Sequence, residues 1–134
     1  ETLRRMLRRC DMMFGDAIEF DWISEHPQPP FTATDSNFKM QIPEYREWFD
    51  ELHRDYPRCR QWLMGMRNIV DSQHHTLTAL LWTDGTLLEA PIVDIPDVVD
   101  PVGVGDAFMG GFLHAISLFP DDHQRQLDYS LAAA

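Results

Sequence analysis

Long apolar runs are missing from this sequence. No stretch approaches the roughly 18 apolar residues that a membrane-spanning helix needs, so we expect no transmembrane segment and no membrane partner. The first residues are rich in arginine and contain no apolar signal core, so we also expect no signal peptide. Two cysteines, Cys10 and Cys59, are too few for a disulfide framework; one bridge is an alternative, but reduced thiols in the cytoplasm are favoured.

Positive charge is also scarce. The 134 residues hold 11 Lys and Arg against 22 Asp and Glu, a net charge of −11, which excludes a protein that binds nucleic-acid phosphates. The shortage of positive charge is greatest in residues 68–134, which contain one cation, Arg125, and ten acidic residues. The length suits one domain with a hydrophobic core. The start at Glu1 and the stop within a helical pattern lead us to expect a piece of a longer protein.

Hydrophobic periodicity predicts both helices and strands along the chain. We expect helices near residues 3–10, 16–25, 43–56, 106–119 and 121–134. We expect strands at 11–15, 59–66, 76–82 and 86–93, the last two joined as a hairpin at Thr83-Asp84-Gly85. The polar, proline-containing stretch 27–41 is expected to be a loop, with Pro43 in the first turn of the next helix. This order of elements is typical of an α/β sandwich.

The segment from Val98 to Phe112 holds the most informative pattern. Gly103 and Gly105 lie between the end of a strand and the start of a helix, where a glycine turn can direct consecutive N–H groups at one point. The first N–H groups of the helix lack internal partners and carry the positive end of its dipole, so together they suit a phosphate. Asp106 falls in the first turn, where its carboxylate could accept a proton from an attacking hydroxyl.

Other interpretations of this pattern are available. On spacing alone, an aspartate at a helix start is more often a cap than a base. A dinucleotide-binding G-x-G-x-x-G motif fails, because Phe108 occupies its small sixth position. A P-loop fails too, because no lysine follows Lys39.

Residues 100–108, Asp-Pro-Val-Gly-Val-Gly-Asp-Ala-Phe, resemble the D-x-x-G-x-G-D-x-F signature of the ribokinase-like (PfkB) carbohydrate kinases. Residues 14–19, Phe-Gly-Asp-Ala-Ile-Glu, stand where that family has a strand followed by N-x-x-E, with Asp16 in place of the usual Asn. Residues 66–82, from Met66-Arg67 to Trp82, are similar to the nucleotide-side segment of 2-keto-3-deoxygluconate kinases.

The resemblance implies a ribokinase-like three-layer α/β/α sandwich, of which residues 1–134 would be the C-terminal, nucleotide-binding part of a single kinase domain. It implies ATP-dependent phosphorylation of a hydroxyl on a sugar or sugar acid, with 2-keto-3-deoxygluconate favoured. The sugar-binding part and the lid, through which family dimers form, would lie outside this piece, which alone would be inactive. Another family activity (fructokinase, ribokinase, nucleoside kinase) and a non-catalytic regulator that binds a nucleotide or sugar are the alternatives.

The resemblance also implies roles for individual residues. Asp106 would be the general base, and Gly103, Val104 and Gly105 would form the anion hole around the transferring phosphoryl. Asp16 and Glu19 would help to place Mg²⁺, through water. The nucleotide would be contacted by Arg67, His75, Asp100 and Leu131.

Several conspicuous side chains have plainer interpretations. The His74-His75 pair could suggest a metal, but a loop role near the nucleotide is favoured. Trp48, Trp62 and Trp82 are expected in the core. Trp22, Phe31 and Phe38 are expected in a peripheral segment.

Overall fold

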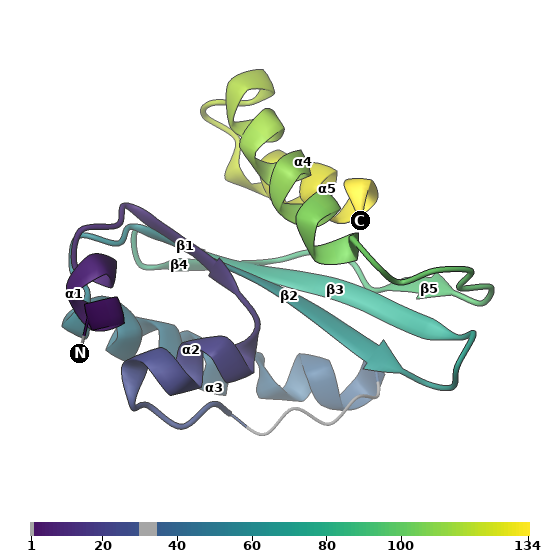
Figure 1. The fold of residues 1–134 in the computed structure, drawn as a ribbon, viewed down its shortest axis with the longest axis horizontal. Coiled ribbons are helices and arrows are strands. Elements are labelled where there is room, and N and C mark those ends of the chain that lie inside the picture. The colour runs from purple at the N-terminus through teal and green to yellow at the C-terminus, as the bar shows by residue number, and fades with distance from the viewer. Residues whose placement is uncertain (1, 30–34) are drawn as a thin grey trace. The chain divides into compact units, whose positions relative to one another are not determined.

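A computed structural model describes the backbone of residues 2–29 and 35–134 and the side chains of residues 2–29 and 42–134 (Figure 1). The chain divides into two compact units, Glu1–Met64 with Leu81–Leu87 and Gly65–Leu80 with Leu88–Ala134. The helices are α1 (Thr2–Leu7), α2 (Ala17–Ser24), α3 (Asp35–Asp55), α4 (Val104–Leu118) and α5 (His123–Ala133). The strands are β1 (Met12–Gly15), β2 (Gln61–Ile69), β3 (His75–Thr83), β4 (Thr86–Glu89) and β5 (Val93–Ile95).

The strands form one sheet in the order β1-β2-β3-β4, and β5 also pairs with β3. β1 runs parallel to β2, with Met12 opposite Gln61 and Gly15 opposite Met64. β3 and β5 are antiparallel, with His75 opposite Ile95. Parallel neighbours need a long crossover between them, and α2 and α3 supply it here.

Aromatic side chains fill the core of the first unit. Phe20 of α2 lies edge-on to Trp62 of β2, with ring centroids 5.5 Å apart, and Trp48 contacts Phe49 on α3 at 5.4 Å. Such tilted and edge-to-face pairs stabilise a core beyond the effect of area burial. The expectation that Trp48, Trp62 and Trp82 are core residues is confirmed, since each is at most 3% exposed.

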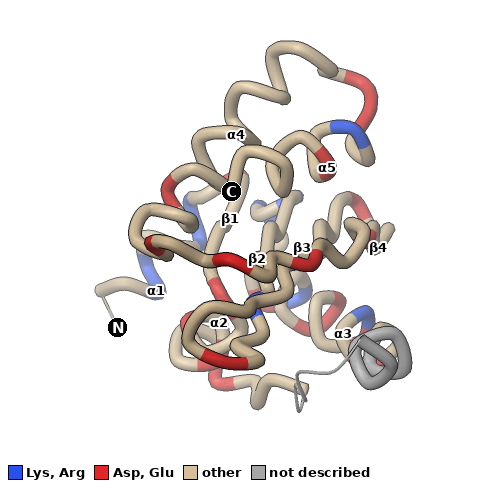
Figure 2. The backbone as a smooth tube through the Cα atoms, turned by 90° about the vertical axis from the view of Figure 1, so that its right-hand side faces the viewer, with Lys and Arg blue, Asp and Glu red and all other residues tan. Residues whose placement is uncertain are grey.

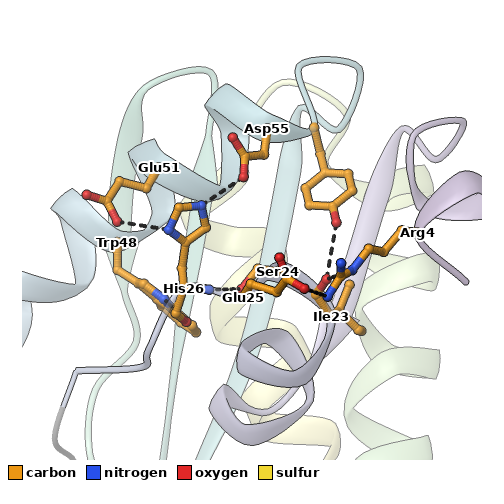
Figure 3. Close-up of polar contacts among 9 residues, drawn as sticks. Arg4, Ile23, Ser24, Glu25, His26, Trp48, Glu51 and Asp55 are labelled. Atoms are coloured by element: carbon orange, nitrogen blue, oxygen red, sulfur yellow. Dashed lines mark hydrogen bonds and ion pairs between the residues drawn. The ribbon is translucent and has the colours of Figure 1, made fainter. Parts of the chain in front are cut away.

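Polar contacts fix the junction that follows α2 (Figure 3). Glu25 closes the helix in a left-handed conformation, with φ 65°, and its carboxylate pairs with Arg4. The next residue, His26, lies between two carboxylates of α3, with Nδ1 3.4 Å from Glu51 and Nε2 2.8 Å from Asp55 (Figure 3). The end of α2 is therefore held to α3 by charged groups as well as by aromatic packing.

The predicted hairpin is confirmed between β3 and β4. Asp84 and Gly85 both have positive φ, 47° and 84°, which is the conformation of the two-residue turn that matches strand twist. Arg60 braces the turn, because its guanidinium donates to both carboxylate oxygens of Asp84 at 2.7 and 2.8 Å.

The single strand expected at 86–93 is wrong, since the structure has two strands, β4 and β5, with Pro91 between them. The Ala90 N–H still donates to the Ala79 carbonyl at 2.9 Å, but Val93 is already opposite Leu77, so the register shifts by one residue. Proline has no N–H to donate, so the ladder cannot continue through it and the chain bulges.

The loop expected up to residue 41 is also wrong in its second part, because α3 begins at Asp35 and Pro43 lies inside the helix. An internal proline removes one helical hydrogen bond and crowds the preceding turn, but it does not prevent a helix from continuing on both sides. The buried stripe after Pro43 that holds the helix comprises Tyr45, Trp48, Phe49, Leu52 and Tyr56.

The three aromatic residues expected in a peripheral segment are placed only in part. Trp22 is 76% exposed on α2, as a peripheral position implies. Phe31 and Phe38 lie outside the described side chains.

In the second unit α4 packs against α5, and both helices were expected. The Ser130 hydroxyl of α5 donates to the Phe108 carbonyl of α4 at 2.7 Å. Gly111 allows a close approach, since an added Cβ would lie 2.6 Å from the Ala133 Cβ. Within the described ranges, no helix has the length and apolar character to cross a bilayer.

Candidate functional site

The start of α4 carries a set of backbone N–H groups without helical acceptors. Gly103 is the N-cap residue and is left-handed, with φ 86° and ψ −2°, which a glycine adopts without strain. The first bond of the helix runs from the Ala107 N–H to the Gly103 carbonyl at 2.8 Å. The N–H groups of Val104, Gly105 and Asp106 precede that bond, and no acceptor faces them within residues 2–29 and 35–134.

The Asp106 side chain is not a cap. The N-cap position belongs to Gly103, no side chain caps the helix, and Asp106 is its third residue. Its carboxylate is exposed and makes no hydrogen bond or ion pair in the described part of the chain. The capping interpretation, which spacing alone favoured, is therefore wrong, and the carboxylate is available to a ligand.

Asp100 shapes the turn that leads into the helix. Its Oδ1 accepts a hydrogen bond from the Val102 N–H at 2.9 Å, as in a turn that an aspartate side chain closes. Val99 and Val102 are 98% and 86% exposed, so this turn presents apolar side chains to solvent.

The other residues predicted to contact the nucleotide are also in the second unit, but their surroundings differ. Arg67 lies near the end of β2 with an exposed side chain. His75 is the first residue of β3 and is buried, so it is not in a loop as expected. Leu131 is buried on α5. A nucleotide role remains a prediction for these three residues and for Asp100, and Arg67 is the one cation among the four.

Asp16 and Glu19 belong to the first unit, where they cap α2 reciprocally. The Asp16 carboxylate accepts from the Glu19 N–H at 2.8 Å, and the Asp16 N–H donates to Glu19 Oε2 at 3.0 Å. Gly15 makes room for this arrangement, because an added Cβ would lie 2.8 Å from that Glu19 oxygen. The cap was not predicted from the sequence, although the D-x-x-E spacing is typical of one.

The two carboxylates still fit a water-mediated Mg²⁺ site. Each is exposed and uses one oxygen in the cap, which leaves Asp16 Oδ2 and Glu19 Oε1 for a hydrated cation. No group of three or more His, Cys, Asp or Glu side chains forms a closed metal cluster in the described part of the chain. The pair therefore suits a cation that keeps most of its waters.

Cys59 offers no alternative nucleophile. Cys10 and Cys59 are both free thiols, as expected. Cys59 is buried, and burial raises the pKa of its thiol to about 12, so the reactive thiolate is not populated at neutral pH.

Positively charged residues are few in the second unit, and most of α4 and α5 carries none (Figure 2). The second unit has two cations, Arg67 and Arg125, and the Arg125 guanidinium lies 4.6 Å from the centroid of the Phe119 ring. Arg67 is then the one cation of this unit left for an anion. If an anion binds to this unit, backbone N–H groups would have to supply most of the remaining positive potential around it.

The comparisons with known proteins agree on one family. The sequence profile of the pfkB family of carbohydrate kinases matches residues 1–134. No single curated protein is similar enough to be matched. Similar solved structures include a PfkB family carbohydrate kinase from Listeria grayi, with 23% identity over 98% of this chain and a TM-score of 0.77.

Two further structures have names that specify a substrate. The 2-dehydro-3-deoxygluconokinase of Thermotoga maritima is 17% identical over 98% of this chain, with a TM-score of 0.79. A protein assigned as a 2-keto-3-deoxygluconate kinase from Enterococcus faecalis is 16% identical over 95%, with a TM-score of 0.71. This chain spans 34–36% of the length of these structures. The expected α/β, ribokinase-like fold is confirmed, and the chain belongs to the pfkB family of carbohydrate kinases.

Proposed function

We propose that this chain is the C-terminal, nucleotide-binding part of a single kinase domain that transfers the γ-phosphoryl group of ATP to a hydroxyl of a sugar or sugar acid. The observation that carries the proposal is the uncapped first turn of α4. Three N–H groups without acceptors follow the left-handed Gly103, and the exposed carboxylate of Asp106 belongs to the same turn. This combination provides an anion site and a proton acceptor within one turn of helix.

The proposed chemistry uses both parts of that turn. The Asp106 carboxylate accepts the proton of the sugar hydroxyl. The hydroxyl oxygen of the sugar bonds to the γ-phosphorus, while the bond from that phosphorus to the bridging oxygen of ADP breaks. The N–H groups of Val104, Gly105 and Asp106 donate to the phosphoryl oxygens, whose charge they stabilise in the transition state. Because the donors are backbone groups, the size of the Val104 side chain does not affect this role while the turn keeps its shape.

The remaining positions would bind the nucleotide and its cation. Arg67 and Asp100 lie on exposed parts of the second unit and suit contacts with a nucleotide. His75 and Leu131 would shape the nucleotide side from the packed interior. Asp16 and Glu19 would hold Mg²⁺ through water, and Mg²⁺ when bound would neutralise charge on the phosphates.

The favoured acceptor is 2-keto-3-deoxygluconate. Support comes from the similarity of residues 66–82 to kinases of this sugar acid and from the names of two similar structures. We place the protein in the cytoplasm, which suits free Cys10 and Cys59.

The test is a phosphorylation assay of the full-length protein on a panel of sugars and sugar acids, with Asp106→Asn as the variant. We expect turnover to fall about 10²–10⁴-fold while ATP affinity is retained, because the variant loses the proton acceptor and keeps the backbone donors. Asp97→Asn is the matched control, since Asp97 is an exposed aspartate with no side-chain partner in the described structure.

Two outcomes would contradict the proposal. Unchanged turnover in Asp106→Asn would remove Asp106 as the base. A wild-type protein that binds ATP but phosphorylates no member of the panel would instead indicate a non-catalytic binding protein.

A further inference from the structure

The turn between β2 and β3 is locked by its own hydrogen bonds. The Asp71 Oδ1 accepts from the N–H groups of Gln73 and His74, at 2.8 and 2.9 Å. The His74 carbonyl accepts from the N–H groups of Val70 and Asp71, at 2.9 and 3.1 Å. Four hydrogen bonds within residues 70–74 fix the conformation of this turn, so a segment bound to the turn is fixed with it.

Two contacts join this turn to the segment that leads to α4. The Gln73 carbonyl accepts from the Val98 N–H at 2.7 Å. His74 Nε2 lies 2.5 Å from Asp94 Oδ1, and Asp94 is the middle residue of β5. The backbone contact and the ion pair therefore hold the chain on either side of Pro96.

Little else holds that segment. Residues 96–103 contain no helix or strand, and Val99 and Val102 are almost fully exposed. In the described part of the chain, residues 96–103 form one hydrogen bond to a segment other than α4, which is the bond from the Val98 N–H to the Gln73 carbonyl. Gly103, the N-cap of α4, follows five residues after Val98. The position of the first turn of α4 thus depends on a short exposed stretch with one firm attachment.

We propose that His74 is a positioning residue: with Asp94 and the Gln73 carbonyl it anchors residues 96–103 and so sets where the N–H groups of residues 104–106 point. The consequence for catalysis rests on the proposed kinase function, whereas the anchor itself does not. Asp94 is exposed and His74 is half-buried, they are twenty residues apart in sequence, and neither needs to touch a substrate.

The anchor is expected to weaken as pH rises. The hydrogen bond to Asp94 raises the pKa of His74, and the charges of Asp94 and Asp71 act in the same direction. Because the pKa of His74 is higher in the folded than in the unfolded protein, the contact contributes its full stability at pH values below the unfolded-state pKa. That stability is lost as the pH rises through the folded-state pKa and His74 loses its proton. The N–H groups of Gln73 and His74 lower the pKa of Asp71, so Asp71 stays ionised while His74 titrates. The next residue in the chain, His75, is buried.

The test compares Asp94→Asn with Asp97→Asn in the full-length protein. Hydrogen exchange of residues 96–103 should be about two- to fivefold faster in Asp94→Asn, the range expected when one exposed ion pair is lost. The pKa of His74, followed by NMR of its imidazole, should fall in Asp94→Asn only. Asp97→Asn removes the same charge from the same segment and should leave both measurements at wild-type values.

Steady-state kinetics of Asp94→Asn show whether the anchor affects catalysis or only the stability of the segment. In Asp94→Asn, kcat should fall about two- to fivefold with little change in the KM for ATP, and the pH at which kcat declines should move down with the His74 pKa. Wild-type exchange rates in Asp94→Asn would overturn the anchor, and faster exchange with an unchanged kcat profile would overturn its role in positioning. A wild-type protein without kinase activity would contradict the proposed function, while the exchange and NMR results would still decide the anchor.

Discussion

Two aspartates at helix starts have different surroundings in this chain. Asp16 is an N-cap residue, and its carboxylate is engaged by the backbone of Glu19. Asp106 is third in α4 behind a glycine N-cap, and its carboxylate has no partner in the described structure. The residue at the N-cap position therefore decides which aspartate closes its helix and which keeps an unengaged carboxylate in the described structure.

Substitutions at Asp16 should separate its structural role from a role with Mg²⁺. Asp16→Ala removes the cap and should cost about 0.5–2 kcal/mol in the free energy of unfolding. Asp16→Asn keeps an oxygen acceptor and should cost less than half as much, while it removes a charge that would help to hold hydrated Mg²⁺. Denaturant unfolding measures the first effect and Mg²⁺ titration of activity the second. Equal destabilisation by both variants would contradict the capping role.

At the scale of the element, α4 and α5 approach closely at Gly111. An added Cβ there would lie 2.6 Å from the Ala133 Cβ and 3.3 Å from the Ser130 Cα, and the second of these is backbone. Gly110, the preceding residue, has nothing within 4 Å of an added Cβ. The two glycines are neighbours in sequence, but only Gly111 is needed for packing.

Alanine at these two positions should have opposite effects on stability. Gly111→Ala should destabilise by about 1–3 kcal/mol, because the helices must separate to admit the methyl group. Gly110→Ala should stabilise by about 0.5–1 kcal/mol, because alanine is the better helix former. Denaturant unfolding of both variants checks the pair. A Gly111→Ala protein as stable as Gly110→Ala would show that α4 and α5 are not closely packed.

Elements with a strong hydrophobic period were predictable from sequence. Phe108, Phe112 and Ala115 mark the buried face of α4, and the structure buries all three. The start of α3 was missed, although Phe38 and Ile42 continue the helical spacing of Tyr45. The polar residues 35–37 and the proline at position 43 are both typical of loops, and they outweighed that spacing. The division of β4 from β5 follows from the missing N–H of Pro91, a local effect that strand propensity does not register.

At the scale of the whole molecule, the distribution of charge limits how a nucleotide could be bound. Residues 68–134 have Arg125 as their single cation, and that side chain stacks on Phe119. A triphosphate would then depend on backbone N–H groups, on Arg67 and on a divalent cation.

ATP binding by the full-length protein should therefore depend strongly on Mg²⁺. Removal of the cation should weaken ATP affinity by at least about tenfold, or roughly 1.4 kcal/mol of binding free energy, because few side-chain cations can replace its charge. The effect should exceed that in a lysine-containing P-loop enzyme. Calorimetric titration with ATP in excess Mg²⁺ and in excess EDTA measures it, and equal affinities would contradict this account.

The candidate site was predictable where it is continuous in sequence. Residues 103–106 form one turn, so their glycines and aspartate pointed to an anion site before any fold was known. The contact between His74 and Asp94 was not predictable, because β3 and β5 must first pair to bring together residues twenty apart. The cap between Asp16 and Glu19 has a recognisable D-x-x-E spacing, but two carboxylates at this spacing also suit a metal, and spacing alone does not separate the two roles.

The central claim is that the N–H groups of Val104, Gly105 and Asp106 receive the phosphoryl group during transfer. The most direct measurement is NMR of these backbone amides in the full-length protein with ADP, Mg²⁺ and aluminium fluoride, which imitates a phosphoryl group in transfer. We expect large shifts at all three amides and none at Gly110, one turn further along α4. Binding of the same mixture without shifts at residues 104–106 would contradict the account.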